Sequence, residues 1–201
     1  MRLFEQPPDY RCFLRLVRRA QSRTPMRCLA YCVMPNHFHL VLWPAAEGDL
    51  SQFMFWLTTM HARTWQRFHG TEGLGHVYQG RFKALPVAED GHLLRLCRYV
   101  EQNPLRSGLV SRAEDWQWSS LSQWRDGGVG VRLTPWPVVR PDDWLRLVNE
   151  VSPDETASIR KAIRRSAPYG TDGWTEAIVS KLGLERTVAP IGRPKKEAGF
   201  R

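Results

Sequence analysis

The chain has 201 residues, of which 42% are hydrophobic and 24% are charged, proportions typical of a folded globular protein and not of a disordered or fibrous one. Its formal net charge of +9, from 29 basic and 20 acidic residues, favours a polyanionic partner such as a nucleic acid. No apolar run reaches the roughly 18 residues that span a bilayer, and the N-terminus "MRLFEQPPDY" lacks an apolar signal region, so we expect a cytoplasmic protein without a membrane partner.

The first quarter of the chain predicts a helix followed by a β-hairpin. Apolar residues at helical spacing predict the helix over residues 9–20. A short strand over 29–33 and a second over 37–43 flank the turn dipeptide Pro35-Asn36.

Two histidines, His37 and His39, stand at the start of the second strand. Residues two apart in a strand point to the same face, with Cα atoms about 6.6 Å apart, so both imidazoles can reach one metal ion. Two surface histidines on an edge strand are an equally open interpretation. A structural zinc site that adds Cys28 and Cys32 is disfavoured, because these residues lie about 13 Å apart in a regular strand. The sparse cysteines, with no C-x-x-C, are expected to be reduced thiols.

A longer helix follows, which Asp49 or Ser51 can cap and which Gly70 ends. Its expected inward stripe consists of Leu50, Phe53, Leu57, Met60, Thr64 and Phe68. The next segment, "HVYQGRFKALPV", predicts a strand that carries Gln79, Arg81 and Lys83 on one face, where they could hold a phosphate chain.

A further helix is predicted from Gly91 to Gln102, capped by Asp90 and ended by Pro104. Its apolar face holds Leu93, Leu96, Cys97 and Val100, and its opposite, polar face holds His92, Arg95, Tyr99 and Asn103.

On that polar face, Tyr99 and Asn103 are four residues apart and therefore adjacent. A tyrosine hydroxyl with a pKa near 10 is a weak nucleophile unless it is activated. A metal held by His37 and His39 could polarise a phosphate for its attack, with Asn103 as a third, oxygen ligand. The combination describes phosphoryl transfer from DNA to a tyrosine. The alternative for Tyr99 is an ordinary half-buried tyrosine with its hydroxyl in water.

Beyond residue 108 the spacing of apolar residues becomes less regular. The sequence as a whole predicts a division of the chain into three parts. Residues 1–125 form the expected catalytic domain, 126–187 a small helical extension with helices between about 153 and 184, and 188–201 a basic, disordered tail.

Four stretches, "AYCVMPNHFHLVLWP", "VYQGRFKALPV", "LCRYVEQNPLRSGLV" and "DWQWSS", occur in this order. Together they resemble the HUH-type single-strand DNA transposases that use one tyrosine, and specifically the REP-associated tyrosine transposases. The stretch "LGLERTVAPIGRPKK" near the C-terminus also resembles that branch. The resemblance runs from about residue 2 to 196 and is strongest over 30–120.

The resemblance implies a ferredoxin-like α+β fold, with helices on one face of an antiparallel sheet. His37 and His39 match the metal-binding pair, Tyr99 matches the nucleophile, and Asn103 stands where relatives carry a polar third ligand. The implied reaction is cleavage of single-stranded DNA with Mg²⁺ or Mn²⁺, which leaves a 5′-phosphotyrosine and a free 3′-OH. Two imidazoles and one amide oxygen suit those ions better than a closed zinc site does.

The resemblance also implies partners. Relatives recognise imperfect hairpins in repeated extragenic DNA, so we expect single-stranded or hairpin DNA as the partner, bound by a monomer or homodimer. Arg81, Lys83 and Arg106 are the candidate phosphate contacts, beside Gln79. In the tail, Arg193, Lys195 and Lys196 either enter the minor groove of a hairpin stem or merely solubilise the chain's end.

One departure concerns the N-terminus. Family members carry another strand before the first helix, whereas this chain begins at the helix. We expect the loss of that strand to leave backbone groups of the neighbouring strand unpaired, and it implies either a start upstream or a shortened copy.

Three functions therefore remain in view. The leading hypothesis is a metal-dependent, tyrosine-nucleophile DNA strand transferase. The second is an inactive protein that only binds DNA hairpins. The third is a metallohydrolase of small phosphate esters, which would not need Tyr99.

Overall fold

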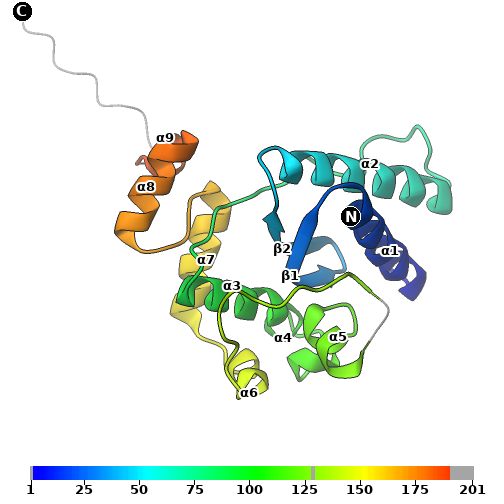
Figure 1. Cartoon of the computed structure of the whole chain (residues 1–201). Helices are drawn as coiled ribbons and strands as arrows, with labels where there is room; N and C mark the ends of the chain where they lie inside the picture. Colours follow the sequence, from blue (N-terminus) through cyan, green and yellow to red (C-terminus); the bar gives the residue numbers. More distant parts are fainter. Residues whose placement is uncertain (1, 128–129, 191–201) are drawn as a thin grey trace, which may run out of the picture.

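The computed structural model describes residues 2–127 and 130–190 (Figure 1). The first half contains α1 (Pro7–Arg23), β1 (Met26–Met34), β2 (His37–Pro44), α2 (Asp49–His69) and α3 (Gly91–Glu101). The second half contains α4 (Asn103–Arg106), a 3₁₀ turn η1 (Ala113–Asp115), α5 (Ser120–Asp126), α6 (Trp144–Asn149), α7 (Pro153–Arg165), α8 (Asp172–Leu182) and α9 (Glu185–Val188). The predicted α+β class, with an antiparallel β1–β2 pair, is confirmed. None of the helices in these two ranges is long and apolar enough to cross a membrane.

Strand β1 is buried on both of its faces. Tyr31 and Val33 pack in one hydrophobic cluster with α1 and α2, whereas Cys32 and Met34 pack in a second cluster with α3. The sheet therefore lies between α1 and α2 on one side and α3 on the other (Figure 1). The expectation of helices on one face only is wrong, because nearly every side chain of β1 is apolar and both faces must be shielded from water.

The edge of β1 that faces away from β2 is covered by residues 116–120 and 134–136. The N–H of Val33 donates to the carbonyl oxygen of Trp118 at 2.9 Å, and the N–H of Tyr31 donates to Oγ of Ser120 at 3.0 Å. Three carbonyl groups on this edge accept hydrogen bonds from the same segment: Val33 from Nε1 of Trp116, Leu29 from Nε1 of Trp136, and Cys28 from the N–H of Thr134. The expectation that this edge is left unpaired is therefore wrong, because later side chains and backbone satisfy it.

A buried carboxylate ties α3 to this covered edge. Glu101 is fully buried, and its two oxygens accept hydrogen bonds from Oγ of Ser120 at 2.5 Å and Nε1 of Trp144 at 2.8 Å. Burial raises the pKa of Glu101, while the two hydrogen bonds lower it and oppose that shift. Ser120 also contacts the backbone of Tyr31, so Glu101 links α3, β1 and α6.

Two predicted features of the middle of the chain are wrong. The segment 76–87 is not a strand, because its backbone pairs only at its end, where Val87 forms a single bridge with Tyr169. Val77 and Tyr78 pack into the core beside α2, whereas Phe82 and Ala84, expected on the inward face, are exposed. Phe68, expected on the inward stripe of α2, is 75% exposed.

Helices α6 and α7 share their core with α3. Trp144 and Val148 of α6 and Ile159 of α7 are buried in the same cluster as α3. The tail predicted over 188–201 lies outside the described residues from 191 onward.

We predict that acid destabilises the fold through His61 of α2. Its ring is buried and stacks on Phe4, and its Nδ1 is hydrogen-bonded to the hydroxyl of Tyr78 at 2.5 Å. Burial lowers the pKa of His61 to about 4, against about 6.5 in an unfolded chain. Between those values the unfolded chain binds more protons, so this contribution is complete above about pH 6.5 and is lost toward pH 4.

Urea denaturation at pH 7 and pH 5 measures this effect. The loss of unfolding free energy on acidification should be smaller in His61→Phe than in the wild type, and unchanged in His76→Gln, which alters an exposed histidine. An equal loss in His61→Phe would contradict the assignment.

Candidate active site

The two histidines of β2 lie side by side on the face of the sheet that packs against α3. Their ring centroids are 4.9 Å apart with nearly perpendicular planes. His37 is exposed and His39 is partly buried, opposite Met34 and Cys32 of β1. The hairpin register therefore places both imidazoles on one face, as their spacing predicts.

Both imidazoles are held neutral. Partial desolvation by its neighbours lowers the pKa of His37, whose solvent-facing edge stays open. Burial first, and then electrostatic repulsion from His37 and Arg106, lowers the pKa of His39 to about 3. Nδ1 of His37 lies 2.7 Å from Oδ1 of Asn36. Since an amide oxygen only accepts hydrogen bonds, Nδ1 carries the proton and Nε2 keeps its lone pair.

Tyr99 of α3 stands beside these rings. Its ring centroid lies 5.9 Å from that of His39. Asp90 caps the helix by accepting the N–H of His92 at 2.7 Å, and apolar residues such as Leu96 anchor the helix on the sheet. Tyr99 is only 7% exposed, so the expectation of an open polar face on this helix is wrong at this position.

Arg106 also packs on the ring of Tyr99. Its guanidinium carbon lies 3.9 Å from the centre of the Tyr99 ring, and one of its nitrogens donates to Oδ1 of Asn103 at 2.9 Å. The chain can place Arg106 there because Pro104 starts the short helix α4 immediately after α3. His37, His39, Tyr99, Arg106 and Asn103 thus form one continuous series of contacts.

The donors suit a divalent ion only in part. Two neutral imidazoles with a free ring nitrogen can bind one, and they leave its other positions to water and phosphate oxygens. Asn103 is buried, and its oxygen accepts from Arg106 while Nδ2 has no partner. Within residues 2–127 and 130–190, no three His, Cys, Asp or Glu side chains form a metal-binding group.

The remaining predicted DNA contacts lie apart from this series. Gln79, Arg81 and Lys83 are exposed in the irregular segment 76–87, and no hydrogen bond or ring contact among the described residues joins them to the histidines or Tyr99. Arg193, Lys195 and Lys196 lie outside the described residues.

Sequence reasoning missed the supporting residues Asn36 and Glu101. Asn36 could have been noticed as the residue beside His37, because a ligating imidazole commonly donates its second N–H to an oxygen. Glu101 carries a weaker signal, a carboxylate between apolar residues of an amphipathic helix. Also missed was the row of arginines on α1, whose four-residue spacing is visible in the sequence.

Comparison with known proteins places these residues in context. Residues 3–103, half of the chain, match a family model described as "Transposase IS200 like". The REP-associated tyrosine transposase of Escherichia coli (strain K12) is 24% identical over 147 residues, which is 73% of this chain and 79% of that protein. No solved structure matches this chain.

Proposed function

This chain belongs to the IS200-like transposase family, and from that premise we propose that it cleaves and rejoins single-stranded DNA through a covalent link to Tyr99. The observation that carries the proposal is that the Tyr99 ring packs against both the imidazole of His39 and the guanidinium of Arg106. A nucleophile beside a ligand pair and a cation is arranged for attack on a phosphodiester.

In the proposed reaction, Oη of Tyr99 attacks the phosphorus of the scissile phosphodiester. The new bond joins Oη to the 5′-phosphate, the bond from phosphorus to the 3′ oxygen breaks, the phenol gives up its proton and the 3′ oxygen gains one. Attack by a 3′-OH on the phosphotyrosine reverses these changes and rejoins DNA without an external energy source. Arg106 is proposed to neutralise charge on the phosphate oxygens.

His37 and His39 are the proposed metal ligands, with Asn103 as a third. A bound Mg²⁺ or Mn²⁺ would polarise the phosphate and orient its oxygens. Neutral imidazoles support this assignment, because a protonated ring cannot ligate an ion. For Asn103 to ligate, its oxygen must accept the ion in addition to Arg106, or in its place.

We propose hairpin-forming repeat DNA as the substrate, on the strength of the similarity to the REP-associated tyrosine transposase. Gln79, Arg81 and Lys83, which are exposed, and the tail residues Arg193, Lys195 and Lys196 are proposed to contact its backbone. Residues 1–125 are proposed as the catalytic part and 126–187 as an extension that buttresses it through α6 and α7.

A metal-dependent adduct assay tests this function. Full-length protein is incubated with labelled single-stranded hairpin DNA from beside its own gene, with Mn²⁺, with Mg²⁺ or with EDTA, and resolved on a denaturing gel. We expect a shifted protein–DNA band with either ion and none with EDTA. DNA binding without any band would favour the hairpin-binding alternative, and hydrolysis of a small phosphate ester without a band would favour the metallohydrolase.

A further inference from the structure

A row of arginines runs along the outer face of α1. Arg11, Arg15, Arg19 and Arg23 are all exposed and follow one another at intervals of four residues. Four residues of helix rise about 6 Å, so the guanidinium groups form a continuous basic line along the helix. A line of cations on one helix matches a single phosphate backbone better than it matches a compact anion.

These arginines form no ion pair with an acidic side chain among the described residues. Within residues 2–127 and 130–190, the arginines in ion pairs are Arg95, Arg98, Arg112, Arg125 and Arg146, all of them beyond α2. Asp9, the one acidic residue of α1, is already engaged by the N-terminal backbone of the helix and by His69. The line on α1 is therefore free to act on an external polyanion.

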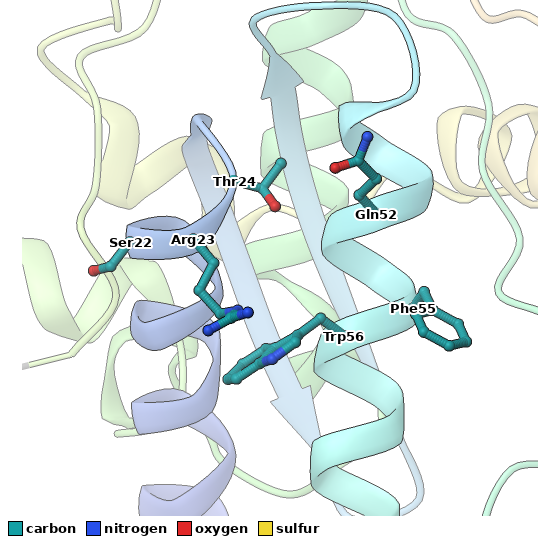
Figure 2. A pocket seen from close by; sticks show the side chains of 6 residues that line it. All are labelled: Ser22, Arg23, Thr24, Gln52, Phe55 and Trp56. Carbon is teal, nitrogen blue, oxygen red and sulfur yellow. The ribbon is translucent and has the colours of Figure 1, made fainter.

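The line of arginines ends at an aromatic pocket between α1 and α2. The pocket has a volume of about 530 Å³ and is lined by Ser22, Arg23, Thr24, Gln52, Phe55 and Trp56 (Figure 2). Phe55 is 72% exposed, and the guanidinium carbons of Arg19 and Arg23 lie 5.9 Å and 5.4 Å from the centre of the Trp56 ring. In Figure 2 the ring of Trp56 points toward Arg23, whereas the ring of Phe55 points away from α1. An exposed aromatic ring near a line of arginines is a surface on which an unpaired base can stack.

We propose that this face of α1 and α2 is a second DNA site that holds a single strand, with phosphates along the arginines and a base on the exposed ring of Phe55. A base pair in a duplex keeps its faces stacked inside the helix and offers none to the pocket, so the occupant is single-stranded. The site lies across the sheet from Tyr99, since α1 and α2 pack on one face of β1 and α3 on the other.

This arrangement gives one DNA strand two separate binding sites on the protein. DNA held at α1 must pass around the sheet before it reaches Tyr99, so the second site tethers the flanking strand without taking part in cleavage. The inference rests on the proposed function only for the choice of DNA as the polyanion.

The site is tested by measuring the binding of a fluorescent 12-nucleotide oligo-dT to the full-length protein. The measurement is made in EDTA at a series of salt concentrations. In Arg19→Ser/Arg23→Ser the slope of log K against log salt should fall by about 1.4, the release expected for two phosphate contacts of a single strand. In Phe55→Ala the Kd should rise about tenfold with the slope unchanged, as for the loss of one stacked base.

Two control variants match the test variants in the charge removed and in the exposure of the residue replaced. Arg125→Ser/Arg146→Ser removes the same charge from exposed arginines that have acidic partners, and Phe68→Ala removes an exposed phenylalanine from the far end of α2. Both should bind oligo-dT as the wild type does. Equal losses in the control pairs, or unchanged affinity in the α1 and Phe55 variants, would overturn the proposal.

A blunt duplex of the same length separates the two kinds of DNA. Tighter binding of the duplex, lost in the arginine variant but not in Phe55→Ala, would also overturn the single-strand site. An adduct in the wild type with oligo-dT binding unaffected by the α1 and Phe55 variants would sink this inference alone. Conversely, oligo-dT binding that the α1 and Phe55 variants weaken, without any adduct in the wild type, would contradict the proposed cleavage and leave this inference standing.

Discussion

Full-length Tyr99→Phe protein is expected to form no covalent adduct with DNA while it binds the same DNA as tightly as the wild type. Only the phenolic oxygen is lost, and the ring that packs against His39 and under Arg106 is kept. Without that oxygen no bond to the 5′-phosphate can form, so adduct formation should fall by at least about 10³-fold.

The measurement compares adduct bands and DNA affinity in parallel. Tyr169→Phe is the matched control, because it removes the oxygen of another buried tyrosine that packs against a histidine, in this case His92. The control should form the adduct normally. An adduct that persists in Tyr99→Phe would assign the nucleophile to a different residue.

Glu101→Ala is expected to lower the free energy of unfolding by roughly 2–5 kcal/mol, because two buried donors lose their acceptor. Those donors are the hydroxyl of Ser120 and the indole N–H of Trp144. Since Glu101 lies two residues after Tyr99 and fastens α3 to the edge of β1, a fold that survives should also form adduct more slowly.

Glu101→Gln is the matched comparison, because its side chain has the same shape. The amide oxygen can accept from Trp144, while the amide nitrogen donates to Ser120, whose hydroxyl can then turn to the carbonyl of Tyr31. We expect its urea midpoint to stay close to that of the wild type. A loss in Glu101→Gln as large as in Glu101→Ala would show that charge, rather than the hydrogen bonds, sustains the contact.

The features of the site that depend on residues close together in the sequence could be predicted from local patterns. The hairpin, the shared face of His37 and His39, and the helix that carries Tyr99 all follow from two-residue or helical periodicity. The position of Tyr99 against His39 depends on how α3 crosses the sheet, so the sequence suggested it only as a chemical combination and through the resemblance to a family.

Features set by contacts far apart in the chain escaped prediction. Segment 76–87 alternates like a strand, yet a strand also needs a partner edge, and that cannot be seen within a window of twelve residues. Arg106 was predicted as a phosphate contact, but its packing on the ring of Tyr99 was not predicted. The residues that hydrogen-bond to the outer edge of β1 lie more than 80 positions later in the chain.

Because the residues that cover the outer edge of β1 come late in the sequence, that edge cannot be covered until well after the hairpin has left the ribosome. The hydrogen bonds on the outer edge of β1 join residues 83, 89 and 107 positions apart. At the usual speed of translation, the nascent hairpin waits about 5 to 20 seconds before its partners emerge. During that interval β1 exposes an apolar strand edge that nascent neighbours can pair with, and chaperones have the same window in which to shield it.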